Sequence, residues 1–428
     1  MNSCFDDILL DKISADGEVT TSVGVGSSPK FRFVFTFSSV DNALYEYSKQ
    51  YYNAAKLIVD MIVEQSRRHE VTDQCPIGML YFLRHSVELM LKAIMFKQTK
   101  SRASQLFSDC KHELSKLKNN INFQTLDKAE LAKMTSYFSE IDTIDPTGDL
   151  FRYPFNEDFL RTYHNRFFDI YDMFCLYSLY FEDLNYEYTG KPYEILDLET
   201  IKQMNDIREK RGNLFIIEAT HGMGYFMIWE PNYDYPSHNQ IDGYGKIGKY
   251  LYNHMLNNQN GMDICVPLMF TYRHLVEISM KNFIYHILDH FRDEIESLAQ
   301  KNGDSNFKSF RSYMRCHEIH KKLLDNVEAS LRYLATEFNW PQERINTYRL
   351  QIEEIKMCDK NSEKFRYPID KSCSFFEYPT IYVDSFCKLC EQCAEIPDNC
   401  SYAFEDMKDW YYDMIADCYG NDGGSDWC

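Results

Sequence analysis

The chain has 428 residues, of which 44% are hydrophobic, and a formal net charge of −19 at pH 7. One hydrophobic core rarely serves more than about 250–300 residues, so this length predicts two domains. The acidic balance argues against broad electrostatic adhesion to nucleic acid, and no segment approaches the roughly 20 apolar residues of a membrane span.

The first half of the chain is expected to be helical after residues 1–30, which are expected to be loosely ordered. Phenylalanines alternate with other residues over 31–37, which predicts a short strand. Apolar residues at helical spacing then predict helices over 42–68, 76–97, 126–141 and 157–184. We expect a polar loop over 98–109 and a charged connector over 195–211.

The second half is predicted to repeat this order. The segments 214–220 and 225–231 flank a glycine-rich turn, which is typical of a β-hairpin. The predicted helices cover 247–256, 265–291, 317–337, 341–357, 379–395 and 402–419.

Three sequence landmarks occur twice in the same order. Leu83–Ile94 and Tyr272–Phe283 share Arg-His-x-Val-Glu-x-x-x-Lys, His112-Glu113 recurs as His317-Glu318, and Phe-Arg-Tyr-Pro stands at 151–154 and 365–368. A collinear set of this kind indicates a tandem duplication with a period too long for a solenoid. The predicted fold class is mainly α, with two repeated helical bundles and a short β-strand or hairpin at the start of each copy. The predicted divisions are a loose N-terminus (1–30), copy one with its connector (31–212), copy two (213–394) and an acidic C-terminal tail (395–428).

The repeated motif carries titratable residues on one side of a helix. Arg84, His85, Glu88 and Lys92 form a stripe next to the apolar face, and three interpretations stay open: a solvated face, a structural network in which Glu88 and Glu277 clamp the turns, and a functional site. Each Phe-Arg-Tyr-Pro turn presents an arginine at a break that its proline enforces. The predicted polar constellation is Arg84, His85, Glu88, Lys92, His112 and Arg152 in copy one, and Arg273, His274, Glu277, Lys281 and Arg366 in copy two.

Charge and cysteine patterns add further expectations. Seven bases lie in the stretch from Lys92 to Lys118, which predicts a local basic surface, whereas the tail from Glu395 onward holds nine acidic residues and one base. The start of the chain lacks the pattern of a secretory signal, so we expect a cytoplasmic protein with reduced thiols and no membrane contact. Four cysteines with metal-like spacing fall within a helical pattern and are expected to be buried free thiols, with no metal or cofactor: Cys387, Cys390, Cys393 and Cys400.

The motif helix followed by a loop and His-Glu-Leu resembles the opening of HEPN-superfamily domains. These are small helical bundles of prokaryotic toxin–antitoxin and antiviral defence systems, and active members place an Arg and a His at a dimer cleft to cut RNA. The resemblance implies an internal pseudo-dimer, able to oligomerise further, with metal-independent endoribonuclease chemistry if active. In copy two the matching pairs are Arg311 with His317 and Arg315 with His320, in which a histidine acts as general base and an arginine steadies the phosphate.

A second class of function stays open at this point. A non-catalytic interaction or regulatory module of a larger assembly would carry no nuclease activity and would bind a protein partner, for which the acidic tail is the expected contact. Copy one has no Arg–His pair of the required spacing, because the arginine nearest upstream of His112 is Arg102. The sequence therefore leaves RNA and a protein as the two alternative partners.

Overall fold

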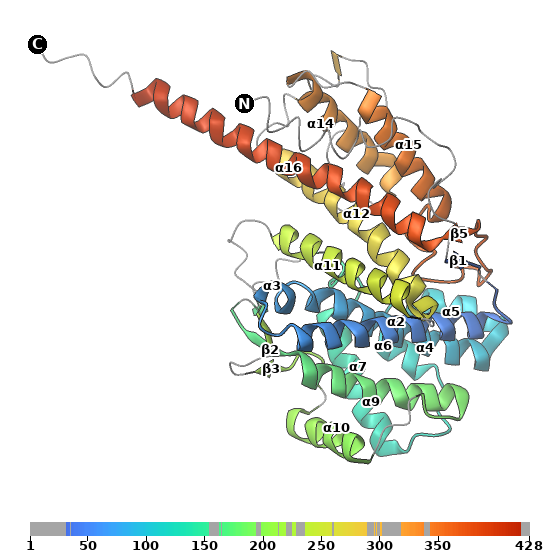
Figure 1. Cartoon of the computed structure of the whole chain (residues 1–428). Coiled ribbons are helices and arrows are strands. Elements are labelled where there is room, and N and C mark those ends of the chain that lie inside the picture. The colour runs from blue at the N-terminus through green and yellow to red at the C-terminus, as the bar shows by residue number, and fades with distance from the viewer. Residues whose placement is uncertain are drawn as a thin grey trace, which may run out of the picture. The chain divides into compact units, whose positions relative to one another are not determined.

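The architecture is that of a computed structural model and is mainly helical, with a few short strands (Figure 1). The structure describes residues 31–34, 36–153, 162–163, 165–193, 198–212, 214–219, 225–227, 236–258, 261–288, 295, 297, 300–301, 318–337 and 343–420. Within these residues, no helix is both long enough and apolar enough to cross a membrane.

The chain forms two compact units, which are described separately. The N-terminal unit comprises Phe31–Tyr272 together with Glu363–Asp384, and the C-terminal unit includes Arg273–Ser362 and Ser385–Cys428. The domain boundary predicted at Gly212 lies inside the N-terminal unit. The segment Glu363–Asp384, which contains the second Phe-Arg-Tyr-Pro turn, thus belongs to the unit that holds the first copy of the motif helix.

Two long helices form the centre of the N-terminal unit. Helix α2 (Val40–Glu64) begins after Ser39, whose hydroxyl accepts from the backbone N–H of Asn42. Helix α4 (Pro76–Thr99) begins with a proline, whose fixed φ suits the first helical turn. Every residue of α4 from Met79 to Met95 is buried, because the helix is apolar on all sides apart from its motif residues.

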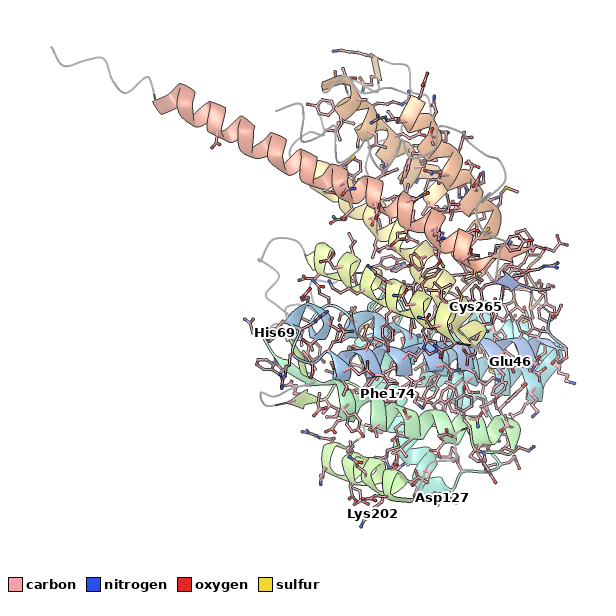
Figure 2. The ribbon with its side chains drawn as sticks, in the orientation of Figure 1. Glu46, His69, Asp127, Phe174, Lys202 and Cys265 are labelled. Atoms are coloured by element: carbon pink, nitrogen blue, oxygen red, sulfur yellow. The ribbon has the colours of Figure 1, made fainter. Side chains whose placement is uncertain are left out.

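Further helices surround this pair: α3 (His69–Thr72), η1 (Lys100–Arg102), α5 (Ala103–Cys110), α6 (Leu114–Asn119), α7 (Lys128–Ile144), α9 (Ile170–Thr189), α10 (Leu198–Arg211), α11 (Pro236–Asn257) and η2 (Gly261–Ile264). Asp127, labelled in Figure 2, caps α7 by accepting from two backbone N–H groups. The polar loop predicted over 98–109 is wrong, since η1 and α5 occupy it and bury Ala103. The connector predicted over 195–211 contains α10, whose Arg208 pairs with Glu130 of α7 at 2.8 Å.

Short strands form two small sheets in the same unit. Strand β1 (Arg32–Phe33) pairs with β5 (Ile381–Tyr382), and both are antiparallel and only two residues long, so the strand predicted over 31–37 was too long. In the second sheet, β2 (Phe167–Asp169) lies between β3 (Glu218–Ala219) and β4 (Tyr225–Met227). The predicted hairpin is therefore wrong, because its two arms are separated by β2. The helix predicted over 157–184 is interrupted by β2, and helix α9 begins at Ile170 after the capping Asp169. Residues 162–163 are helical, and residues 157–161 lie outside the described residues.

The C-terminal unit is built from helices. They are the greater part of α12 (Cys265–Leu288), the π-turn η4 (Ile319–Leu323), α14 (Leu324–Glu337), α15 (Glu343–Cys358) and most of α16 (Val383–Gly420). Two C-terminal helices were predicted, but α16 is one continuous helix with Pro397 inside it. A proline removes one backbone hydrogen bond without necessarily ending a helix, so the periodicity on both sides belongs to a single element.

Candidate functional site

The polar residues of the motif in α4 are buried. Arg84, His85, Glu88 and Lys92 are 1%, 2%, 1% and 7% exposed. The solvated-face interpretation is therefore wrong. A buried charge costs several kcal/mol unless it is paired and hydrogen-bonded, so the partners of these residues decide what the group does.

Glu88 is the hub of the group. Its Oε1 accepts from Lys92 Nζ at 2.6 Å and Tyr367 OH at 2.8 Å, and lies 3.0 Å from His112 Nδ1. Its Oε2 accepts from Arg84 Nη1 at 2.7 Å. Burial raises the pKa of Glu88, but Lys92, His112 and Arg84 together lower it well below the usual value, so the carboxylate stays ionised.

Arg84 has hydrogen-bonding or ionic partners for all three of its nitrogens. Besides Glu88, its Nη2 donates to the backbone carbonyl of His112 at 2.7 Å, and its Nε lies 2.9 Å from Asp145 Oδ2. Gly148 lies against this guanidinium and has a positive φ of +73°, which favours glycine. A Cβ atom at this position would lie only 3.0 Å from Nη1 of Arg84. Burial lowers the pKa of Arg84, but Asp145 and Glu88 raise it by more, so the net pKa lies above its ordinary value. The guanidinium therefore stays charged, and its contacts give it a structural role.

His112 differs from the others because its side chain is 37% exposed. It stands just before α6, where Asp142 accepts from the backbone N–H groups of Leu114 and Ser115 at 2.8 Å. With Nδ1 facing the Glu88 carboxylate, the imidazole is oriented by a buried anion. This arrangement suits general acid–base chemistry, in which a carboxylate fixes the tautomer and the other ring nitrogen exchanges protons.

His85 lies in a different environment and has a different role. Its Nε2 is 2.9 Å from the carbonyl oxygen of Arg366, and its ring stacks on Tyr81 and meets Tyr51 edge-on. Burial lowers the pKa of His85 to about 3. The neutral ring therefore donates its Nε2–H to that carbonyl, and His85 anchors the second turn.

The two Phe-Arg-Tyr-Pro turns have the same backbone bonds. The N–H groups of Arg152 and Tyr153 donate to Asp149, and those of Arg366 and Tyr367 donate to Glu363. The carbonyl of the phenylalanine that opens each turn accepts from a helix tyrosine: Tyr51 of α2 donates to Phe365 at 3.0 Å, and Tyr244 of α11 donates to Phe151 at 3.1 Å.

The arrangement matches the predicted structural network in part. The Glu88 carboxylate does contact the second turn, but through the hydroxyl of Tyr367. Arg152 forms an ion pair with Asp149 in its own turn. Sequence reasoning missed Tyr367 and Asp145 as members of the group, although both lie in repeated segments and that repetition was the available signal.

The second motif helix, α12, carries a similar set in the C-terminal unit. Glu277 Oε1 accepts from Lys281 at 2.8 Å, and Glu277 Oε2 is 3.4 Å from Arg273 Nη1. Arg273, Glu277 and Lys281 have no exposed area, and His274 is 1% exposed. This set is therefore more deeply buried than its counterpart.

The ribonuclease pairs suggested by the resemblance lie mostly outside the described residues. Arg311, Arg315 and His317 are among the positions that the structure does not describe. His320 is in η4, partly buried, and burial followed by Lys356 lowers its pKa. The structure therefore gives no distance between the arginine and the histidine of either pair.

The remaining predictions concern the basic stretch, the cysteines and the tail. Lys92 belongs to the buried network, and the exposed bases of the stretch are Lys97, Lys100, Arg102, Lys111 and Lys116. The four helix cysteines are buried, and burial raises the pKa of Cys400 to about 12. No group of metal-binding side chains occurs in the part of the chain that the structure describes. The tail enters α16, and residues 421–428 lie outside the description.

Three comparisons with known proteins were made for this chain. No family model, no characterised protein and no solved structure matches it.

Proposed function

We propose that the chain consists of two HEPN-like helical copies fused in tandem, which act on RNA through a metal-independent phosphodiester cleavage centred on His112. The main support for this activity is the position of His112, which is partly exposed and whose Nδ1 lies 3.0 Å from the buried carboxylate of Glu88. An ionised carboxylate behind an imidazole stabilises the imidazolium that forms when the ring takes a proton.

Matching positions support the tandem arrangement. Helices α4 and α12 each contain 24 residues, and in each the motif arginine stands eight residues after the first helical residue. Tyr51 and Tyr244 each stand thirteen residues before the end of their helices, α2 and α11. Each of them donates to the carbonyl of the first phenylalanine in the other copy's turn, so each copy's helix holds the turn of the other copy.

The proposed reaction uses the 2′-hydroxyl of RNA. His112 removes the proton from this hydroxyl, the 2′-oxygen attacks the adjacent phosphorus, and the bond to the 5′-oxygen breaks as that oxygen takes up a proton from water. The hydroxide that remains then takes the proton from His112, which restores the neutral ring. The products are a 2′,3′-cyclic phosphate and a free 5′-hydroxyl. Exposed Lys111, adjacent to His112, and Lys116 in α6 supply positive charge for the phosphate backbone.

The test is cleavage of single-stranded RNA by the full chain in the presence of a chelator. General acid–base groups contribute roughly 10²–10⁴-fold, so His112→Ala is expected to lower the rate by about 100-fold or more. His69→Ala is the control, because His69 is an exposed histidine of α3 (Figure 2), and it should cleave as wild type does. The same strand made of 2′-deoxynucleotides should stay intact.

Two outcomes contradict the proposal. A wild-type chain that does not cleave RNA leaves the buried network with a structural role only, and favours the non-catalytic interaction module. Loss of partner capture on deleting the residues after Glu395 would then support that alternative. If instead His112→Ala cleaves normally while the double change His317→Ala, His320→Ala abolishes cleavage, the reaction belongs to copy two.

A further inference from the structure

Tyr367, from the second turn, reaches the centre of the network built on the first motif helix. Its hydroxyl is 2.8 Å from Glu88 Oε1 and 3.3 Å from His112 Nδ1. Its ring meets His85 edge-on at 5.1 Å, and Lys92 Nζ lies 4.7 Å from the ring centroid. The side chain therefore contacts both members of the carboxylate–imidazole pair and packs against two other motif residues.

The hydroxyl can act only as a donor to the carboxylate. Burial and then the Glu88 charge raise the pKa of Tyr367 well above its usual value, so the phenol stays protonated. Oε1 thus has three partners, of which Lys92 and Tyr367 bond it independently of the imidazole. Because Arg84 bonds the other oxygen, Oε2, the carboxylate plane is fixed in a single orientation.

We propose that Tyr367 is a positioning residue for His112: by holding Glu88 it aims the carboxylate at Nδ1 of the imidazole. The site on copy one is then completed by the turn of copy two. This inference rests on the proposed function for its catalytic meaning, but the effect of Tyr367 on the reactivity of His112 can be measured without any substrate.

The segment that carries Tyr367 is held in place by other bonds. The Tyr51 hydroxyl bonds the Phe365 carbonyl, the Tyr47 hydroxyl bonds the Lys364 carbonyl at 3.2 Å, and β5 pairs with β1. Removing one hydroxyl from Tyr367 therefore leaves the segment anchored in the N-terminal unit. Phenylalanine at this position keeps the ring and its packing.

Tyr378 provides a matched control in the same segment. Its hydroxyl donates to the Lys364 carbonyl at 2.8 Å and lies 3.2 Å from the Tyr47 hydroxyl. Tyr378→Phe thus removes a hydroxyl bond from this segment without changing the partners of Glu88. A merely structural role of Tyr367 would make the two variants behave alike.

The first experiment measures modification of His112 by diethyl pyrocarbonate as a function of pH, with peptide mass spectrometry on the full chain. In Tyr367→Phe the Glu88 carboxylate is no longer held against Nδ1 by the hydroxyl, so it stabilises the protonated ring less and the pH profile of His112 modification should move toward lower pH. Tyr378→Phe should keep the wild-type profile. Equal profiles in all three proteins, or equal shifts in both variants, would overturn the inference.

The second experiment measures RNA cleavage by the same three proteins. Loss of one hydrogen bond to a charged group should lower kcat of Tyr367→Phe about tenfold with little change in KM, while Tyr378→Phe keeps the wild-type kcat. A wild-type chain without cleavage that still shows the shifted profile refutes the proposed function and leaves the positioning role standing. Normal cleavage by Tyr367→Phe refutes the positioning role and leaves the proposed function standing.

Discussion

The two motif helices carry the same four polar residues at the same positions but place them in different surroundings. In α12 the Glu277–Lys281 pair is wholly buried, whereas in α4 the side chain of Lys92 is 9% exposed and Glu88 also contacts the partly exposed His112. The same four residue types at the same spacing therefore do not give equal access to solvent. A set with a partly exposed imidazole is able to exchange protons with the solvent.

A buried charge can be kept because its partner would otherwise be left unpaired, or because it takes part in chemistry at the surface. A buried ion pair is weak support for stability, because desolvation offsets its attraction, but the removal of one partner leaves the other charge unpaired. Both sets are subject to this constraint, and His317, the sequence counterpart of His112 in the second copy, lies outside the described residues. The α4 set has the same constraint and, in addition, a route from the buried carboxylate to the surface through His112.

The largest expected effect is the loss of stability when the central glutamate of each set is replaced by alanine. Glu277→Ala should lower the free energy of unfolding by about 3–5 kcal/mol, as expected when a buried pair loses one partner. Glu88→Ala should cost less, because Lys92 and His112 have some access to water. Urea unfolding followed by circular dichroism measures both, with Glu46→Ala as the control, since Glu46 forms a partly exposed ion pair with Lys49 on α2 (Figure 2). Equal losses for Glu88→Ala and Glu277→Ala would contradict the comparison.

A second prediction concerns acid. The folded pKa of His85, about 3, lies below its ordinary value of 6.5, so its contribution to stability is complete above pH 6.5 and is lost as pH falls toward 3. His85→Phe should cost about 1–3 kcal/mol at pH 7, because the carbonyl of Arg366 loses its donor. The variant should also depend less on pH between 6.5 and 3, which urea unfolding at several pH values would measure. An unchanged dependence would show that His85 is not the titrating group.

A third prediction compares Glu140 with Glu354, because Glu140-Ile141 recurs in the sequence as Glu354-Ile355 between the second and third repeated landmarks. Burial raises the pKa of Glu140 to about 7, although the backbone N–H of Phe215 donates to it, and burial also raises the pKa of Glu354. A raised carboxyl pKa favours the folded state below pH 4.5, and this contribution is lost as pH rises through 7. With allowance for partial exposure, Glu140→Gln should reduce the loss of stability between pH 4.5 and 7 by about 1 kcal/mol. Glu354→Gln should change it less, and the reverse order in urea unfolding would contradict the assignment.

The smallest expected effects test whether the two turns are equivalent. Tyr51→Phe and Tyr244→Phe each remove one hydroxyl bond to a turn carbonyl, so each should cost about 0.5–1.5 kcal/mol of unfolding free energy. Amide hydrogen exchange should show increased exchange near Phe365 in the first variant and near Phe151 in the second. Increased amide exchange at the same turn in both variants would contradict the contacts of Tyr51 with the Phe365 turn and of Tyr244 with the Phe151 turn.

Local sequence patterns predicted much of the helical structure. Helices α4 and α12 begin at the predicted residues, Pro76 and Cys265, because periodicity and capping act over a few neighbouring residues. The errors fall where neighbours decide: the strands β3 and β4 resemble a hairpin in sequence, but β2 lies between them. Likewise the charged stripe of α4 resembles a surface stripe, although other helices and the second turn cover it.

The order of the repeated landmarks, the composition of the motif helices and the break at each Phe-Arg-Tyr-Pro turn were determined by the sequence alone, because each depends on residues close together in the chain. The tertiary structure decided that Tyr367 joins Glu88, 279 positions away, and that His112 keeps a partly exposed ring. Contacts between distant segments depend on how whole helices pack and which charges they exclude from water. No local pattern contains that information.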